Sequence, residues 1–254
     1  KKRVVKLSVV IITLNEEKYI GRCIDSVMEV ADELVVVDSG STDATVQICT
    51  EKGARVVTHA FEGYVEQKNW AITQANHPHV LSLDADEMLT PELAQEIKSI
   101  KEDWKADGYE IKRRNFYCGK WIRYSGWYPD KKLRLWDSRL GSWTGSNFHD
   151  KFKMKDGAKT LSLNYDLLHF TYDSIDDNLK QIHQFSTRSA EQKFREGKNI
   201  SMIMIILRPP AIFFKKYFLK LGILDGYWGF VIAVLTAYNT FIKDLKLREL
   251  NKNT

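Results

Sequence analysis

The chain has 254 residues, of which 44% are hydrophobic and 28% are charged, and its net charge is +5. This size and composition fit either one large α/β domain or one domain with a helical appendage, and they exclude an intrinsically disordered chain. Its three cysteines, Cys23, Cys49 and Cys118, are too widely spaced for a disulfide framework or a zinc site, so we expect ordinary thiols in a reducing cytosol.

The first hundred residues alternate between strand and helix patterns. Apolar runs predict strands at Val4–Ile12, Glu33–Val37, Val56–Thr58 and His79–Leu83. Helical patterns lie between them at Glu16–Glu29, Asp43–Lys52 and Gly63–Gln74, and Thr90-Pro91-Glu92 opens a further helix. This alternation predicts an α/β fold, in which a mostly parallel sheet has helices on both faces and binds ligands at the carboxyl ends of its strands.

The second half of the chain has a different character. Residues 108–165 are rich in aromatic residues and have strand and loop patterns, so we assign them to a region of the same domain that covers the site. A helix is predicted at Ser174–Glu196, and Pro209-Pro210 marks the boundary of a last basic and aromatic segment. We therefore expect a catalytic domain at residues 1–170 and C-terminal helices at residues 171–254.

The net positive charge lies entirely in residues 201–254, which hold eight Lys and Arg and three acidic residues. A basic segment of this kind indicates an anionic partner surface. Because residues 1–200 carry no net charge and nucleic-acid binding needs a broader basic face, we expect a membrane surface and no nucleic acid.

The C-terminal segment also has the pattern of a membrane-interface helix. Phe214, Tyr217, Phe218 and Leu221 have helical spacing, with lysines nearby, whereas the apolar run Trp228–Ile242 is too short to span a bilayer. We expect peripheral attachment to the inner face of the cytoplasmic membrane. The alternative is an amphipathic helix that packs on the domain or on a dimer partner.

Polar clusters follow three of the predicted strands, and they are Thr13-Leu14-Asn15-Glu16, Asp38-Ser39-Gly40-Ser41-Thr42-Asp43 and Asp84-Ala85-Asp86-Glu87. Two carboxylates at Asp84 and Asp86, directly after a buried strand, suit a ribose and a divalent cation. Mg²⁺ or Mn²⁺ held there would neutralise a diphosphate leaving group. The Asp38 carboxylate is suited to accept the N3–H of uracil, and capping of the next helix by Ser41 or Thr42 is a compatible alternative.

The motifs V-V-I-I-T-L-N-E, V-V-D-S-G-S-T-D and L-D-A-D-E, in this order and spacing, resemble those of family 2 glycosyltransferases with the GT-A fold. The resemblance covers about residues 7–150. It implies a nucleotide-sugar donor held by Thr13, Asn15, Glu16 and Asp38, with Asp84 near the ribose and Asp86 on the metal. Lys68 matches a basic position of the family near the nucleotide, and its alternative is a solvated helix lysine.

An inverting transferase needs a base that takes the proton of the acceptor hydroxyl. The candidates are Asp130 and Asp150, each with a loop turn as the alternative. We favour Asp150 because the pair His149-Asp150 resembles a His-acid motif of the family, with Asp where many relatives carry Glu.

Three further polar residues are candidates for contacts in the site. His149 and His169 are candidate metal or phosphate contacts, although a histidine in the apolar setting of His169 also suits a core. Arg134 alternates with apolar residues and would face a diphosphate, an anionic acceptor or solvent.

The whole chain, including Gly222-Ile223-Leu224-Asp225-Gly226, resembles the lipopolysaccharide inner-core β-1,4-glucosyltransferase subfamily. This implies transfer of glucose from a UDP-sugar to a lipopolysaccharide-core or other lipid-linked saccharide. One alternative is a polyprenyl-phosphate sugar transferase, and another is a non-catalytic membrane-surface binding module. A sugar nucleotidyltransferase is disfavoured, because no glycine-rich loop follows the first strand.

Overall fold

The structure, a computed structural model, describes residues 4–145 and 150–252. The chain folds into two compact units. The first contains the chain up to Arg113 and from Asp130 to His169, and the second contains Arg114–Pro129 and the chain from Phe170 onward. Residues 114–129, which we expected within the catalytic domain, thus lie in the second unit.

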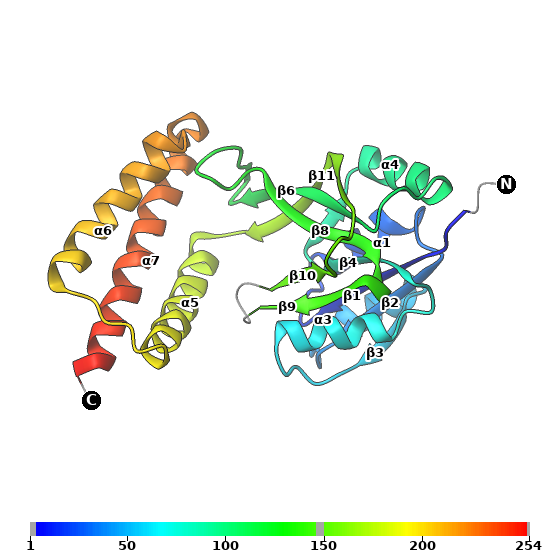
Figure 1. Cartoon of the computed structure of the whole chain (residues 1–254), viewed down its shortest axis with the longest axis horizontal. Coiled ribbons are helices and arrows are strands. Elements are labelled where there is room, and N and C mark those ends of the chain that lie inside the picture. The colour runs from blue at the N-terminus through cyan, green and yellow to red at the C-terminus, as the bar shows by residue number, and fades with distance from the viewer. Residues whose placement is uncertain (1–3, 146–149, 253–254) are drawn as a thin grey trace. The chain divides into compact units, whose positions relative to one another are not determined.

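Four parallel strands form the N-terminal half of the main sheet in the first unit (Figure 1). They are β1 (Leu7–Thr13), β2 (Glu33–Asp38), β3 (Arg55–Thr58) and β4 (His79–Asp84), in the spatial order β3-β2-β1-β4. Thr13 pairs with Asp38 and Ile12 with Asp84, so the polar ends of β1, β2 and β4 meet at one edge, as the sequence predicts.

Helices cover both faces of these strands. They are α1 (Ile20–Val27), α2 (Thr45–Glu51), α3 (Tyr64–Thr73) and α4 (Pro91–Glu102). Side chains alternate along β1, so that Val9 and Ile11 join the core of α1, α2 and α4, and Val10 joins the core of α3. The Thr90 hydroxyl accepts the backbone N–H of Leu93 at 3.2 Å and caps α4, as predicted.

The later strands extend the sheet in the antiparallel direction. They are β5 (Glu87–Leu89), β6 (Gly108–Tyr117), β7 (Lys120–Trp121), β8 (Asp130–Asp137) and β11 (Thr160–Tyr172). The order continues β4-β8-β6-β11-β5, and β7 pairs with β6. A short 3₁₀ turn, η1 (Ser138–Leu140), precedes a separate pair formed by β9 (Gly141–Thr144) and β10 (Lys151–Met154). The predicted α/β class, a parallel sheet with helices on both faces followed by added strands, is confirmed.

All three cysteines are free, as expected. Cys23 and Cys49 are buried, and Cys118 is half-buried. Burial, with a smaller contribution from Asp38, raises the pKa of Cys49 to about 11, so this thiol stays protonated at neutral pH.

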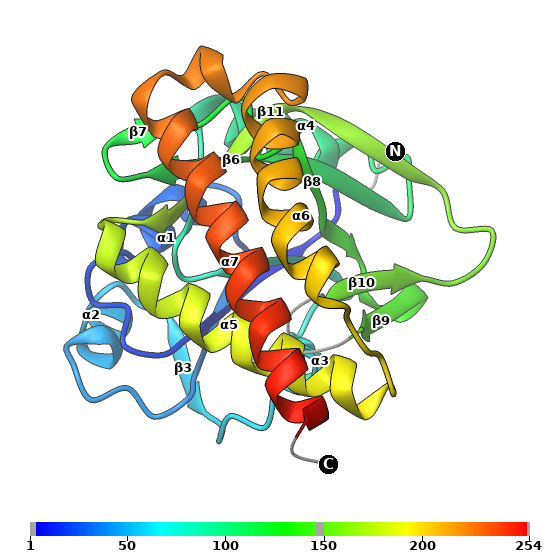
Figure 2. The ribbon, with the colours of Figure 1, turned by 90° about the vertical axis from the view of Figure 1, so that its left-hand side faces the viewer.

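Three helices dominate the second unit (Figures 1 and 2). They are α5 (Ile175–Arg195), α6 (Met202–Phe214) and α7 (Tyr227–Lys252). The Ser174 hydroxyl caps α5 by accepting the backbone N–H of Asp177 at 3.1 Å. Arg208 of α6 donates to the fully buried Asp244 of α7 at 2.8 Å, which ties the two helices together.

Pro209 and Pro210 lie inside α6, so the predicted boundary at this pair is wrong. Each proline removes one backbone donor from the helix. The packing of α6 along α7, including the buried Ile205 and the Arg208–Asp244 pair, maintains the helix despite this loss.

The expected amphipathic helix around Phe214–Leu221 is shorter than predicted. A π-helical turn, η2 (Lys215–Leu219), follows α6, and Leu221 has the left-handed backbone conformation with φ +54°. A 3₁₀ turn, η3 (Gly222–Asp225), then leads into α7. Gly222 is required here, because a Cβ would overlap the Ser125 hydroxyl and lie 2.8 Å from the carbonyl of Lys216.

Asp225 joins this turn to residues 120–124 within the second unit. Its carboxylate accepts the backbone N–H of Tyr124 at 2.8 Å, and its carbonyl accepts from Lys120 Nζ at 2.7 Å. Asp225 is almost fully buried, so the acidic residue of the Gly222–Gly226 motif has a structural role within the second unit.

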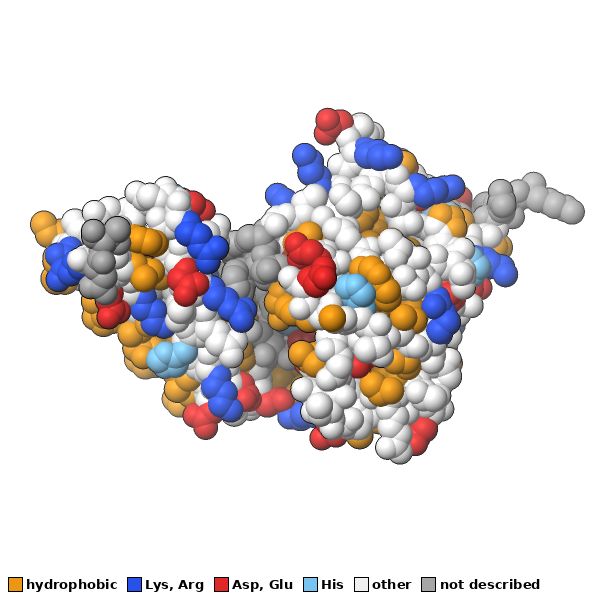
Figure 3. Space-filling view, turned by 90° about the horizontal axis from the view of Figure 1, so that it is seen from below, with side chains coloured by type: hydrophobic (Ala, Val, Ile, Leu, Met, Phe, Trp, Pro, Cys, Tyr) orange, Lys and Arg blue, Asp and Glu red, His pale blue; other side chains and the backbone are white. Residues whose placement is uncertain are grey.

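The surface of the second unit carries large exposed apolar side chains. Figure 3 shows them along one edge of the helical unit, with blue Lys and Arg side chains nearby. Ile203 of α6 is 66% exposed, Leu219 is 67% exposed and Tyr227 is 71% exposed. Among the described residues, no helix combines the length and apolar character needed to cross a membrane.

Candidate active site

A cavity of about 310 Å³ lies at the polar strand ends of the first unit. Its lining includes Thr13, Glu16 and Ser39 from the ends of β1 and β2, and Asp84 and Asp86 from the end of β4. The remaining lining residues are Ile12, Leu14, Phe61, Tyr64, Gln67, Ala85 and His169. The cavity therefore has the position predicted for ligands of such a sheet.

The first two strand ends are fastened to each other. Asn15, at φ +54°, accepts the backbone N–H of Thr42 at 2.8 Å and donates its own N–H to Ser41 at the same distance. The buried Asp38 carboxylate accepts the backbone N–H groups of Gly40 and Ser41 at 2.9 and 3.0 Å. Ser39, rather than Asp38, lines the cavity, so the contacts of Asp38 and Asn15 in this structure shape the loop around it.

Aromatic side chains form another wall of the cavity, and the sequence analysis missed them. Phe61 and Tyr64 meet edge to face with centroids 5.1 Å apart. Gln67 of α3 is held by His59 Nδ1 at 2.8 Å and by the Ser39 hydroxyl at 3.0 Å. Flat rings beside a fixed amide can stack on a nucleobase and bind its edge. In the sequence, the only sign of this aromatic wall is the spacing of Phe61 and Tyr64 at the start of α3.

Asp86 and His169 come together although 83 positions separate them. His169 Nε2 on β11 lies 3.3 Å from Asp86 Oδ2. The other oxygen, Oδ1, is buried and accepts no hydrogen bond from a described residue. An acceptor oxygen without a donor suits a cation.

The described side chains alone do not complete a metal site here. Over residues 4–145 and 150–252, no group of three or more His, Cys, Asp or Glu side chains is arranged to hold a metal ion. Mg²⁺ and related ions are usually bound by one or two carboxylates plus substrate phosphates and water. Asp86, with His169 beside it, fits a metal that arrives with a diphosphate.

Behind Asp84 lies a chain of ion pairs that the sequence did not predict. Arg134 of β8 donates to Asp84 at 2.6 Å and to Glu87 at 2.5 Å. Arg113 of β6 contacts the same Glu87 oxygen at 3.1 Å and pairs with Asp130 at 2.7 Å. Glu87 is fully buried and also accepts the backbone N–H of Asp84 at 3.0 Å, so it fixes the turn that presents Asp84.

Lys68 connects this chain to the favoured base. Its Nζ lies 2.9 Å from Asp84 Oδ1 and 2.8 Å from Asp150 Oδ2. The side chain is only 4% exposed and lies 4.7 Å from the ring centre of Trp143. The alternative of a solvated helix lysine is therefore wrong, because Lys68 is buried between two carboxylates.

The charges of this network set the protonation of Asp84. Burial would raise the pKa of Asp84, but Arg134 and Lys68 outweigh it and hold the pKa well below its usual range. For Asp130, burial is likewise outweighed by Arg113 and Lys132, which lower its pKa. Both groups are carboxylates at neutral pH.

The structure thus brings most candidates to one place, whereas Asn15, Asp38 and Asp130 are not among the described residues lining the cavity. Thr13, Glu16, Asp84, Asp86 and His169 line the cavity, and Lys68, Arg134 and Asp150 adjoin Asp84. Asp130 pairs with Arg113 and Lys132 and is not among the described residues lining the cavity. His149 lies outside the described residues.

The sequence is similar to those of known glycosyltransferases. A family model described as Glycosyl transferase family 2 matches residues 8–156. The chain is 35% identical over 257 residues to an uncharacterized glycosyltransferase of Rickettsia bellii, covering 97% of this chain and 87% of that protein. It is 31% identical over 254 residues to the lipopolysaccharide core biosynthesis glycosyltransferase LpsC of Rhizobium meliloti, covering 95% and 91% of the two chains. Among solved structures, TarS 1–349 of S. aureus aligns with 98% of this chain and 91% of its own, at 17% identity and a TM-score of 0.45.

Proposed function

Because this chain belongs to glycosyl transferase family 2, we propose that it is an inverting hexosyltransferase that uses a UDP-sugar, preferably UDP-glucose, as donor. Its acceptor is a hydroxyl of a lipopolysaccharide-core or other lipid-linked saccharide. The first unit carries the reaction.

One observation carries this proposal. Two buried acceptor oxygens, Thr13 Oγ1 and Asp86 Oδ1, have no hydrogen-bond partner among the described residues, and both belong to residues that line the strand-end cavity. Buried polar atoms normally have partners, so atoms left without one in a cavity point to a bound ligand. A ribose or base donor would satisfy Thr13, and a cation would satisfy Asp86.

We assign each part of the donor to different residues around the cavity. Phe61 and Tyr64 would stack on the uracil, Asp84 would accept from the ribose, and Asp86 with His169 would hold Mg²⁺ or Mn²⁺. A cation held there would neutralise the charge of the departing diphosphate.

Asp150 is the proposed base. It takes the proton of the acceptor hydroxyl while that oxygen bonds to the anomeric carbon and the bond from this carbon to the diphosphate oxygen breaks, which releases UDP. Attack from the face opposite the diphosphate inverts the anomeric carbon. Lys68 holds Asp150 and Asp84 in a fixed relation, so one buried cation orients both carboxylates.

The second unit is proposed to hold the enzyme on the inner face of the cytoplasmic membrane. Exposed apolar side chains on α6 and the following turns, with Lys215, Lys216 and Lys220 among them, suit a bilayer with anionic headgroups. Burial lowers the pKa of Lys216, and the neighbouring charges of Lys215 and Lys220 lower it further. Attachment there would concentrate the enzyme where a lipid-linked acceptor is found.

Calorimetric titration with UDP and with GDP, each with and without Mn²⁺, tests the donor. We expect UDP to bind tightly only with Mn²⁺, and Asp86→Ala to abolish metal-dependent binding and transfer. Asp156→Ala, in an exposed turn, is the matched control. Absence of UDP binding, or full activity of Asp86→Ala, would refute the donor and metal assignments.

Asp150→Asn tests the acceptor chemistry. Loss of transfer with retained UDP binding supports Asp150 as the base for a hydroxyl acceptor. Unchanged transfer by Asp150→Asn would instead favour a polyprenyl-phosphate acceptor, which needs no base.

A further inference from the structure

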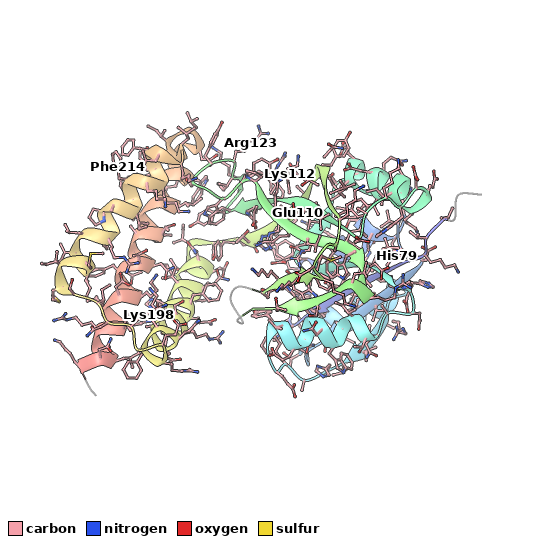
Figure 4. The ribbon with its side chains drawn as sticks, in the orientation of Figure 1. His79, Glu110, Lys112, Arg123, Lys198 and Phe214 are labelled. Atoms are coloured by element: carbon pink, nitrogen blue, oxygen red, sulfur yellow. The ribbon has the colours of Figure 1, made fainter. Side chains whose placement is uncertain are left out.

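A second cavity, of about 460 Å³, adjoins the first at Asp84, which lines both. It is built by β6, β8, β9, β10 and α3 of the first unit. Its lining consists of Lys68, Asp84, Glu110, Arg113, Lys131, Lys132, Leu133, Arg134, Trp143, Asp150, Lys151 and Phe152. Figure 4 labels Glu110 on β6. Lys68, Arg134 and Asp150 are candidates of the sequence analysis, whereas Lys131, Lys132 and Lys151 have no role in the proposed donor site.

The lining is strongly basic, with six Lys and Arg side chains and three acidic ones. The buried cations are already paired: Lys68 with Asp84 and Asp150, and Arg134 with Asp84 and Glu87. Their charge therefore does not call for a ligand.

The other lysines of the lining are not enclosed between carboxylates in this way. Lys131 and Lys151 are exposed, and neither forms an ion pair with a described residue. Lys131 Nζ donates to the Ser162 hydroxyl at 3.3 Å. Lys132 pairs with Asp130 Oδ1 at 3.2 Å, while Arg113 pairs with the other oxygen of that carboxylate. Three lysines from β8 and β10 thus line one space, in which Lys131 and Lys151 leave an excess of positive charge over the carboxylate of Glu110.

The cavity also includes Asp150, the proposed base. An acceptor whose hydroxyl is at Asp150, with the donor beyond Asp84, would place its neighbouring groups in this cavity. A neutral sugar would gain little from three lysines, whereas a phosphate or carboxylate would gain ion pairs.

We propose that this cavity binds an anionic group, a phosphate or a carboxylate, carried by the acceptor saccharide close to the hydroxyl that is glycosylated. Lys131, Lys132 and Lys151 are the binding residues, and they select charged acceptors over neutral ones. This inference rests on the proposed function, because it assigns the second cavity to the acceptor of that reaction.

Titration of the full chain, saturated with UDP and Mn²⁺ so that the first cavity is filled, tests this assignment. The probes are glucose 6-phosphate, glucuronate and neutral glucose. We expect both anions to bind at least about tenfold more tightly than glucose, and added salt to weaken only the anions. Tighter binding of the phosphate or of the carboxylate identifies which group is preferred.

Variants separate this cavity from general surface charge. Lys131→Ala with Lys151→Ala should weaken anion binding about tenfold or more, because each lysine contributes a charge-assisted contact. Lys153→Ala is the matched control, since Lys153 is an exposed lysine of β10 that does not line the cavity. With the natural acceptor, the double variant should raise KM and leave kcat nearly unchanged.

Two results overturn the proposal: equal binding of glucose and the anions, or anion binding that the double variant leaves unchanged. If either occurs while UDP still binds with Mn²⁺, the inference fails and the donor assignment stands. Absence of UDP binding would overturn the proposed function, and with it the assignment of this cavity to an acceptor.

Discussion

Lys68 Nζ lies 2.9 Å from Asp84 Oδ1, and this buried pair joins helix α3 to the end of strand β4. The same nitrogen contacts Asp150, so a single cation holds one residue of the strand-end cavity and the proposed base.

Lys68→Met should keep the side chain's length and remove its charge. We expect kcat to fall on the order of 100-fold, because both carboxylates lose the partner that orients them. UDP affinity should change much less than kcat. Lys98→Met, which removes a lysine paired with Glu29 at the surface, is the control. A Lys68→Met enzyme with wild-type kcat would contradict the role of Lys68.

Glu87→Gln should destabilise the first unit by about 3 kcal/mol, because it removes one partner of a fully buried ion-pair chain. Arg113 and Arg134 would then both lack a carboxylate that they now share. Urea unfolding at pH 7 measures the change in the free energy of unfolding. Glu102→Gln, at the exposed end of α4, should change it by less than about 0.5 kcal/mol. Equal effects of the two substitutions would refute the structural importance of Glu87.

Because of Asp32, the free energy of unfolding of the first unit should decrease at acid pH. Burial would raise the pKa of Asp32, but Lys101, 2.6 Å away, and the backbone N–H of Leu7, at 2.8 Å, lower it overall. A folded-state pKa below the unfolded value of about 3.9 stabilises the fold above pH 4, and this contribution is lost as the pH falls through the folded-state pKa.

Asp32→Asn should therefore cost about 1 kcal/mol at pH 7, a modest value because the carboxylate is 34% exposed. The difference from the parent protein should shrink as the pH drops below about 4. Urea titrations at several pH values measure it, with the exposed Asp156→Asn as the control. A difference that stays constant down to pH 2 would contradict the assignment.

Ile203→Asp with Leu207→Asp should weaken binding to phosphatidylglycerol vesicles about tenfold or more, because two exposed apolar side chains on one face of α6 become charged. Flotation with anionic and with zwitterionic vesicles measures this. Leu161→Asp, at an exposed position of the first unit, is the control. Failure of the parent protein to bind anionic vesicles, together with dimers that the double variant disrupts, would assign this face to a second copy instead.

Local patterns were sufficient for the four parallel strands of the first unit and for much of the strand-end cavity. Strand and helix positions follow from apolar periodicity, and parallel strand ends must meet, which placed Thr13, Asp84 and Asp86 together. The position of His169 beside Asp86 could not be deduced, because it depends on the pairing of β11 with β5.

Two other contacts of the site could not be predicted either, because they join residues far apart in the sequence. Asp150 meets Lys68 across 82 positions, and Arg134 meets Glu87 across 47. Neither pair has a spacing signal, since contacts between strands and helices depend on the order of strands in the sheet. The boundary predicted at Pro209-Pro210 was wrong because prolines usually end a helix, whereas here the packing of α6 maintains the helix through them.

Residues 114–129 are synthesised well before the residues that contact them in the folded protein. Tyr117 donates to Asn178, the N–H of Cys118 donates to Tyr172, and Lys120 donates to Asp225 across 105 positions. At ribosomal speeds of about 5–20 residues per second, roughly 5–20 seconds separate the synthesis of Lys120 from that of Asp225. During that interval the side chains of Tyr117 and Ile122, fully buried in the finished fold, have nothing from α7 to cover them. A nascent or prematurely terminated chain would therefore present these side chains to chaperones.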